Sequence, residues 1–281
     1  MDRGLYTGAL SMVARTVDSD VIANNLANIN TVGFKRDTTV YRDFPAMMLH
    51  RLHDETLWTP MREFDPVPPI GRVGTGVQVD DIVTDHDISP SFQNTGNPFD
   101  MALEGVPGVK SSYAFFEVMT TQGLMYTKAG NFQVNSDGYL VTSTGAFVLG
   151  ENGPIKVDPM NVKFEPDGTI ISNTQYNGEG VNMWQDRRAV DKMRIVTFDN
   201  ADGLEKNGYT FFKSTAESGP PRTVLFGVSL RTGMLESSNV NPVTEMVNLI
   251  KSHRAYEAAA KVVSTHDTLL GQAVNDVGRV G

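Results

Sequence analysis

The sequence predicts a mainly β protein whose two ends are α-helices. Three observations lead to this fold class: an apolar residue spacing typical of a helix near the N-terminus, a proline-marked helix start near the C-terminus, and frequent turn dipeptides between them. We divide the 281 residues into an N-terminal helix (1–36), an extended connector (37–75), a β-rich domain (76–241) and a C-terminal helix (242–281). The two terminal segments are expected to pack together as a coiled-coil-like domain.

The N-terminal segment has the periodicity of a helix with one apolar or small face. Residues of this kind recur every three or four positions, at Leu5, Ala9, Met12, Thr16, Ser19, Ala23 and Leu26. No proline interrupts the pattern, so we expect a helix of roughly 25 residues, about 38 Å long at 1.5 Å per residue.

An asparagine-rich stretch follows the apolar pattern and weakens it. Asn24, Asn25, Asn28 and Asn30 are poor residues for a helix interior, so their side chains are expected to fix register or to end the helix. A solvated, fraying helix end is the alternative interpretation. Gly33 then offers a position where the chain can turn at a positive φ.

The C-terminal helix has a well-marked start. Asn241 suits the N-cap and Pro242 the first helical position. The pattern then predicts a coiled-coil seam of residues seven apart, interrupted by Asp267. The seam comprises Leu249, Tyr256, Val263, Leu270 and Val277, with Met246, Ala260 and Val274 adjoining it.

The middle of the chain is predicted to form short strands separated by turns. Six dipeptides of Asp or Asn followed by Gly favour tight hairpin turns: 137–138, 152–153, 167–168, 177–178, 202–203 and 207–208. Strand and helix patterns do not alternate there, so a parallel sheet is not expected. The connector before this region is rich in Pro, Met and aromatic residues, which predicts an extended segment that packs on a neighbour or on the β-rich domain.

The distribution of charge argues against several partners. The chain has a formal net charge of -9, whereas residues 1–36 carry +1 and residues 242–281 are neutral, which leaves -10 in the middle. Nucleic acid or anionic lipid is therefore not an expected partner, because neither is bound without clustered Lys and Arg. There is no cysteine, no stretch long enough to span a membrane and no cleavable signal pattern. Any export is expected to use a non-cleaved signal.

Two long helices with apolar stripes predict self-assembly. Pairing the two ends within one chain would bury only part of each stripe, whereas neighbouring copies could cover both. Contacts that do not close into a ring propagate helically. We therefore expect the ends to order on assembly, with the lost chain entropy offset by burial.

The expected assembly interface combines the apolar stripes with the asparagine stretch. Arg254 and Tyr256, together with Glu257, suit bridges between subunits, although a heptad position flanked by solvated charges is an equally good interpretation of each residue alone. The full set is Leu5, Met12, Asn24, Asn25, Leu26, Asn28, Asn30, Gly33, Phe34, Met246, Leu249, Arg254, Tyr256, Val263 and Leu270.

No motif predicts catalysis, a cofactor or a metal site. The groups His50, His53, Asp54, Glu55 and Asp85, His86, Asp87 contain possible ligands, but too few for zinc, and both are better explained as polar surface. Nucleophile-elbow, Walker and zinc-protease motifs are absent from the sequence. Two other functions remain open: a polysaccharide- or protein-binding module using Trp58 and Trp184, and a hydrolase using a carboxylate pair such as Asp80 and Asp81.

Motifs at both ends resemble one known family. The segments Arg3-Gly-Leu-Tyr-Thr7, Asn24 to Lys35, Ser238 to Val247 and Arg254-Ala-Tyr-Glu257 resemble the terminal signatures of flagellar rod and hook proteins. Motifs of the middle agree, namely Thr95-Gly-Asn-Pro-Phe-Asp100, Tyr126 to Phe132 and Gly138 to Thr142. The chain departs from the family at Val106 to Phe116 and across the proline-rich connector.

The resemblance implies a structural role and no enzymatic one. It implies export through the flagellar type III apparatus, assembly in the periplasm with copies of the chain and other rod proteins, and a hollow rod that transmits torque. The terminal helices would line the inner wall of that rod. Within the family, the segment Phe147 to Ile155 is closer to proximal-rod than to distal-rod members. The resemblance therefore favours a place in the proximal rod of the basal body.

Overall fold

The computed structural model shows a mainly β chain with a helix at each end. It describes residues 3–50, 69–74, 76–86, 91–105, 114–159, 161–173, 187–223 and 228–277. The chain forms two compact units. Unit 1 contains Met1–Asn24, Thr38–Val83 and Val243–Gly281, and unit 2 contains Asn25–Asp37 and Thr84–Pro242.

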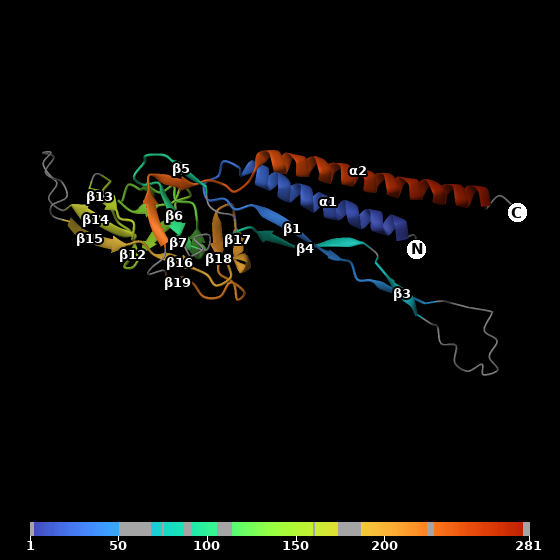
Figure 1. Ribbon diagram of the computed structural model, residues 1–281, viewed down its shortest axis with the longest axis horizontal. Coiled ribbons are helices and arrows are strands. Elements are labelled where there is room, and N and C mark those ends of the chain that lie inside the picture. The colour runs from blue at the N-terminus through green and yellow to red at the C-terminus, as the bar shows by residue number, and fades with distance from the viewer. Residues whose placement is uncertain are drawn as a thin grey trace, which may run out of the picture. The chain divides into compact units, whose positions relative to one another are not determined.

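The two terminal helices were predicted from periodicity and are confirmed. Helix α1 spans Arg3–Ala27 and has 25 residues, and helix α2 spans Pro242–Gln272 and continues as the π-turn η3 (Ala273–Val277). In unit 1 the two helices lie side by side and antiparallel (Figure 1). The start of α1 meets the end of α2, because a side chain at Gly4 would collide with His266. Among the described residues, no helix is long and apolar enough to cross a membrane.

Most of the predicted connector that the structure describes forms paired strands. Strand β1 (Asp37–Asp43) pairs with β4 (Val77–Thr84), and β2 (Met47–His50) pairs antiparallel with β3 (Pro69–Val73). The resulting ribbon touches α1 at several points. The rings of Tyr6 and Phe44 meet edge to face at 5.9 Å, and the Leu10 side chain lies against Gly76. The Thr39 hydroxyl also donates to the Asp18 carboxylate at 2.7 Å. The aromatic content of this segment is thus partly explained by packing within unit 1.

Unit 2 is built on a ten-stranded antiparallel sheet. Its main path runs β17-β18-β8-β7-β11-β10-β9, while β12 joins β11, and β16 joins β7 and β19. Three smaller sheets accompany it: β13-β14-β15, β20-β6 and β21-β5. The strand bounds are β5 Phe92–Asn94, β6 Met101–Gly105, β7 Ala114–Thr120, β8 Gly123–Thr127, β9 Gln133–Val134, β10 Leu140–Val141, β11 Phe147–Gly150, β12 Gly153–Pro154, β13 Val162–Phe164, β14 Thr169–Asn173, β15 Arg187–Lys192, β16 Ile195–Thr197, β17 Glu205–Asn207, β18 Phe211–Lys213, β19 Arg222–Thr223, β20 Val228–Thr232 and β21 Met234–Glu236.

The predicted turn dipeptides mark real chain reversals. Gly138, Gly168 and Gly208 have φ values of 83°, 85° and 73°, where a glycine is favoured. The dipeptide 202–203 lies instead in the 3₁₀ turn η2 (Ala201–Gly203), and 177–178 lies outside the described residues. Because such turns bring successive strands side by side, sequence-local signals account for much of this antiparallel sheet.

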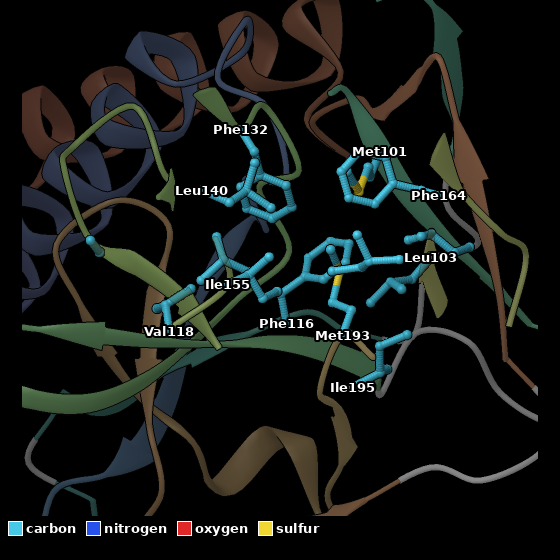
Figure 2. Packing of buried hydrophobic residues seen from close by; sticks show 14 of the residues in the cluster. Met101, Leu103, Phe116, Val118, Phe132, Leu140, Ile155, Phe164, Met193 and Ile195 are labelled. Carbon is cyan, nitrogen blue, oxygen red and sulfur yellow. The ribbon is translucent and has the colours of Figure 1, made fainter. Parts of the chain in front are cut away.

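The core of unit 2 lies against one face of the ten-stranded sheet. Side chains from β6, β7, β11 and β16 converge there with residues of the intervening segments (Figure 2). Phe116 and Phe132 meet edge to face at 5.0 Å in its centre. A second aromatic cluster on the other side contains Phe115, Tyr126 and Phe212. Unit 2 therefore carries its own packed interior.

Candidate assembly interface

Small residues form the contact between α1 and α2. The Ser19 hydroxyl donates to the Ser252 hydroxyl at 3.2 Å, and the Ser252 hydroxyl donates to the backbone oxygen of Arg15 at 3.2 Å. A Cβ at Gly8 would lie 2.8 Å from a methyl group of Val263. The two backbones therefore approach more closely than large side chains would permit.

The buried row of α2 differs from the predicted seam. Its members recur every seven residues, as a coiled-coil position does: Glu245, Ser252 and Ala259. The predicted row lies on the neighbouring flank of the helix, where Leu249 and Val263 are half-buried while Tyr256 and Leu270 are exposed. The close approach of α1 contributes to the difference, since the small side chains of Ser252 and Ala259 fit directly against it.

Much apolar surface on both helices stays uncovered in the single chain. Val13 on α1 is 64% exposed, and on α2 Ile250 is 54% and Leu270 is 44% exposed. The other large exposed apolar side chains of this pair are Tyr6, Val243, Met246, Val247, Tyr256, Val262, Leu269 and Val274. Both helices are nevertheless formed and in contact within one chain. The expectation that the ends order only on assembly stays a prediction, and the exposed apolar side chains leave each helix with a face that the single chain does not cover.

A shallow groove runs along the helix pair. It encloses about 620 Å³ and is lined from both helices by small side chains: Gly4, Thr7, Gly8, Ser11, Ala255, Ala258, Ala259 and Val262. None of these lining residues is ionisable. Four-residue spacing of Gly4 and Gly8 was a sequence signal for this close approach, but the apolar pattern drew attention to other positions.

The remaining residues of the predicted set on α1 fall into two groups. Leu5 and Met12 are half-buried in unit 1, and Leu26 is half-buried in unit 2. Asn24 is exposed and so is Asn30. On α2, Met246 and Arg254 are also exposed. Exposed and half-buried members are open to a second molecule, whereas the buried members described next are not.

The side chains of two of the four asparagines are buried and form hydrogen bonds inside unit 2. Asn25 is 1% exposed and closes a pair of hydrogen bonds with Asp37: its Nδ2 donates to the Asp37 oxygen at 2.8 Å, and its Oδ1 accepts from the Asp37 nitrogen at 2.9 Å. The Asn28 side chain accepts from the Thr31 hydroxyl at 3.1 Å. These bonds end α1 and return the chain toward β1, in agreement with the predicted helix-ending role.

Gly33 occupies a position that excludes any side chain. Its φ is 68°, and a Cβ would lie 2.5 Å from the backbone nitrogen of Ala129. The Gly33 amide donates to the backbone oxygen of Glu236 at 2.9 Å. Phe34 follows, fully buried, with the Lys206 ammonium 4.0 Å from its ring centroid. The positive φ predicted for Gly33 is thus observed, at the point where the segments that contain Gly33, Ala129 and Glu236 meet.

A buried ionic cluster joins the same three segments. The Lys35 ammonium contacts one oxygen of Glu236 at 2.7 Å, and the Lys128 ammonium lies 3.9 Å from the other oxygen. All three side chains are at most 2% exposed. Burial, and secondly the charge of Lys35, lower the pKa of Lys128 to about 8 in spite of the opposing effect of Glu236. No local sequence pattern predicts this cluster, since its members are up to 201 residues apart.

A second ion pair holds the start of β1. The Lys206 ammonium contacts the Asp37 carboxylate at 2.8 Å and also donates to the Lys35 backbone oxygen at 3.0 Å. Burial lowers the pKa of Lys206, and the Asp37 carboxylate opposes that shift. The Thr84 hydroxyl donates to the same carboxylate at 2.8 Å. Segments that connect with unit 1 are therefore fixed within unit 2 by buried polar contacts.

Where the structure describes them, the other candidate residues do not come together as a chemical centre. Within the described parts of the chain, three or more metal-ligating side chains do not gather at any point. His86 is fully buried with edge-to-face contacts to Phe115 and Phe212, so the interpretation of this residue as polar surface is wrong. Asp80 forms an exposed ion pair with Arg42 at 3.1 Å. His53, Asp54, Glu55, Trp58, Asp87 and Trp184 lie outside the described residues, as does the side chain of His50.

Comparison with known proteins agrees with this architecture. Residues 5–35 match the family described as flagella basal body rod protein, residues 112–172 the flagellar hook protein FlgE/F/G D1 domain, and residues 231–276 the flagellar basal body rod FlgEFG protein C-terminal region. The three matches follow the observed order of helix, β-rich unit and helix.

Full-length relatives extend the similarity across the whole chain. The flagellar basal-body rod protein FlgG of Bacillus subtilis is 31% identical over 98% of this chain and 99% of its own length. FlgF of Caulobacter vibrioides is 30% identical over 100% of both chains, and FlgG of Borreliella burgdorferi is 32% identical over 98% of both. These relatives are structural rod proteins and not enzymes. The chain belongs to the flagellar basal-body rod protein family.

Proposed function

We propose that this chain is a structural subunit of the proximal rod, which polymerises helically through its terminal helices into a hollow, torque-transmitting shaft. The observation that carries the proposal is the uncovered apolar surface on both helices of unit 1. Single chains pair α1 with α2 through small residues and leave their large apolar side chains in water. A protein of this size rarely exposes so long an apolar face unless another molecule covers it.

Other copies of the same chain are suited to cover these exposed apolar side chains. The groove between the helices accepts large apolar side chains, and α2 presents such side chains on another face. A contact between two different faces of identical molecules is heterologous and continues from one copy to the next, which produces a helical array. In this proposal the terminal helices pack in a coiled-coil-like manner between copies, and the β-rich part lies outside them.

The proposed interface residues have two roles. The exposed and half-buried members, such as Met12, Met246 and Leu270, contact neighbouring copies. The buried members, such as Asn25 and Phe34, instead hold the segment after α1 inside unit 2. Other rod proteins and the type III export apparatus are proposed partners, with the rod in the periplasm and export without a cleaved signal.

The place in the rod rests on the segment Phe147 to Ile155, which favours the proximal end. FlgG relatives are as similar to the chain as the FlgF relative, so a distal-rod or hook-type position is the alternative. Electron microscopy of basal bodies from a deletion strain separates the two. Rods that stop near the inner membrane support the proximal position, whereas rods that reach the outer membrane but lack a hook contradict it.

The interface is tested by placing a charge on the uncovered face. Leu270→Glu replaces a side chain that is 44% exposed, so the purified chain should keep its helix content and melting temperature. Burying that carboxylate between copies is costly, so incorporation into basal bodies should fall by about tenfold or more. Ser264→Glu, at an exposed polar position of the same helix, is the matched control. Equal incorporation of both variants would refute the assembly role of this face.

A multimerised periplasmic binding module is the remaining alternative. Its proposed ligand-binding side chains, Trp58 and Trp184, lie outside the described residues. Replacing both tryptophans with alanine should leave rod assembly and motility intact if the chain is purely structural. Loss of motility with normal rods would instead favour the binding module.

A further inference from the structure

The exposed apolar surface at the start of α2 includes a methionine. Val243, Met246, Val247 and Ile250 follow the i, i+3, i+4, i+7 spacing, which places them on one side of the helix. We call these four residues the α2 face. Their exposed fractions are 67%, 47%, 44% and 54%. The thioether of Met246 is therefore open to small molecules in the surrounding water.

The methionines of the described chain differ widely in exposure. Those in the core of unit 2 are at most 4% exposed, namely Met101, Met125 and Met193. Met48 on β2 and Met119 on β7 are exposed but do not lie on the terminal helices. Met12 on α1 is half-buried. Among the described side chains of α1 and α2, Met246 is therefore the one exposed methionine.

Thioethers are the sulfur groups of this chain that a peroxide can oxidise. The sequence contains no cysteine, so no thiolate competes for the oxidant. In the reaction with hydrogen peroxide, the methionine sulfur attacks one peroxide oxygen. The O–O bond breaks, the S–O bond forms, and the second oxygen leaves as water after a proton shift. Sulfur loses two electrons, the peroxide gains them, and the product is methionine sulfoxide, which methionine sulfoxide reductases convert back to methionine.

Oxidation of Met246 changes the surface of the single chain and not its fold. Because the side chain is 47% exposed, the new S–O group can remain in contact with water, and the helix pair is kept. The same group on a methionine of the core would disturb packing, but burial keeps the oxidant away from those side chains. The oxidised chain therefore stays folded, while the centre of its apolar α2 face becomes polar.

A polar group at this position opposes the covering of the α2 face by another molecule. Burying a polar group without a hydrogen bond is costly. The neighbours Val243, Val247 and Ile250 have aliphatic side chains, which provide no donor for the sulfoxide oxygen. A second molecule that covers the face with apolar side chains provides none either. Binding through the α2 face should therefore weaken by about tenfold on oxidation.

We infer that Met246 is a site of reversible oxidation by peroxides, and that its sulfoxide keeps an unassembled chain from joining the rod. The inference rests on the proposed function and adds to it a modification that regulates the same helical surface. The modification acts on the free chain, because the proposed assembly covers the α2 face and with it the thioether. Reduction of the sulfoxide by methionine sulfoxide reductases restores the apolar face and the ability to assemble.

Peptide mass spectrometry of the purified full chain tests whether the site is accessible. In hydrogen peroxide, Met246 should gain one oxygen about tenfold or more faster than Met101, Met125 and Met193. The helix content measured by circular dichroism should not change, and a mixture of the two classes of methionine sulfoxide reductase should remove the added oxygen. Equal rates at Met246 and at the buried methionines, or a loss of helix on oxidation of Met246, would contradict the inference.

Two substitutions in the full chain test the effect on assembly. Met246→Gln places a polar, unbranched side chain at the site, so the variant should fold normally but incorporate into basal bodies about tenfold less than wild type. Ser264→Gln, at an exposed polar position of the same helix, is the control and should incorporate normally. Met246→Leu cannot be oxidised at this position. In cells that produce both wild type and Met246→Leu, peroxide should lower the ratio of new wild type to variant in basal bodies by about tenfold.

The outcomes distinguish the inference from the function on which it rests. If untreated wild type is absent from basal bodies, the proposed function itself fails. If untreated wild type incorporates and peroxide leaves its ratio to Met246→Leu unchanged, only the inference fails. Normal incorporation of Met246→Gln would overturn the inference too, and so would the absence of Met246 sulfoxide from the unassembled chains of treated cells.

Discussion

At Gly33 two requirements coincide, and each excludes a side chain for a different reason. The φ of 68° disfavours every residue with a Cβ, and the backbone of residues 128 and 129 occupies the space that a Cβ needs. A backbone atom cannot rotate away as a side-chain atom can. Gly33 is therefore expected to be among the least tolerant positions of unit 2.

Gly33→Ala should destabilise unit 2 by about 3 kcal/mol, combining left-handed backbone strain with a backbone collision. Gly96→Ala is the matched control, because Gly96 has a φ of 72° and nothing within 4 Å of its Cβ, so about 1 kcal/mol is expected from the backbone alone. The free energy of unfolding from urea titration checks the difference. A similar loss of unfolding free energy in both variants would show that the backbone around Gly33 can move to accept a side chain.

The buried Lys128 should make stability depend on alkaline pH. Its pKa is about 8 in the folded chain and 10.5 as a free side chain, so between these values only the unfolded chain keeps the proton. Stability therefore rises with pH across this window, by up to about 3 kcal/mol. Lys206, whose pKa burial also lowers, acts in the same direction. Burial raises the pKa of Tyr126, which opposes this trend above about pH 10.

Lys128→Met removes the buried ammonium and leaves the Lys35–Glu236 pair balanced. We expect this variant to be about 1–3 kcal/mol more stable at pH 7 and to show a smaller rise in stability between pH 8 and 10. Lys213→Met, at an exposed lysine of β18, should change neither quantity. Thermal unfolding followed by circular dichroism across this pH range measures both, and an unchanged slope for Lys128→Met would contradict the assignment.

The pairing of α1 and α2 depends on their small-residue contact. Gly8→Leu adds bulk where a Cβ already lies 2.8 Å from Val263, at an overpacking cost of about 1–3 kcal/mol. The gain in helix propensity from losing a glycine is at most about 1 kcal/mol. Faster hydrogen exchange along both helices is therefore expected. Ala9→Leu, on the exposed neighbouring position, should leave exchange unchanged; equal exchange in the two variants would argue against close approach at Gly8.

For the helices, the sequence predicted existence and bounds but not which face is buried. Length, the Pro242 start and the Asn-rich end are local signals, and all appear in the structure. The apolar pattern does not predict the buried row at Glu245, Ser252 and Ala259. Apolar periodicity marks every helix face that avoids water, and it does not distinguish a face covered within the chain from one that another molecule would cover. For the connector the sequence predicts only an extended segment, because β2 and β3 are separated by residues 51–68 and such distant pairing leaves no short-range signal.

The charge of the whole molecule should control its association. A net charge of -9 repels identical chains at low ionic strength, while the contact surfaces that we propose on the helices are apolar. Raising the ionic strength from 0.01 to 0.15 M shortens the Debye length from about 30 Å to about 8 Å. Self-association of the purified chain should therefore increase, as measured by sedimentation velocity. Association that is strongest at low salt would instead indicate an interface held by opposite charges.

Signals within a few residues, or the composition, predict the helical ends, the turn-rich β middle and the turn at Gly33. Such signals do not predict which row of α2 is covered, or that Lys35, Lys128 and Glu236 share one buried cluster, and both follow from the folded structure. The physical reason is that helix packing, ion pairing and strand register join segments far apart in the chain, and local periodicity contains no information about which distant segments meet.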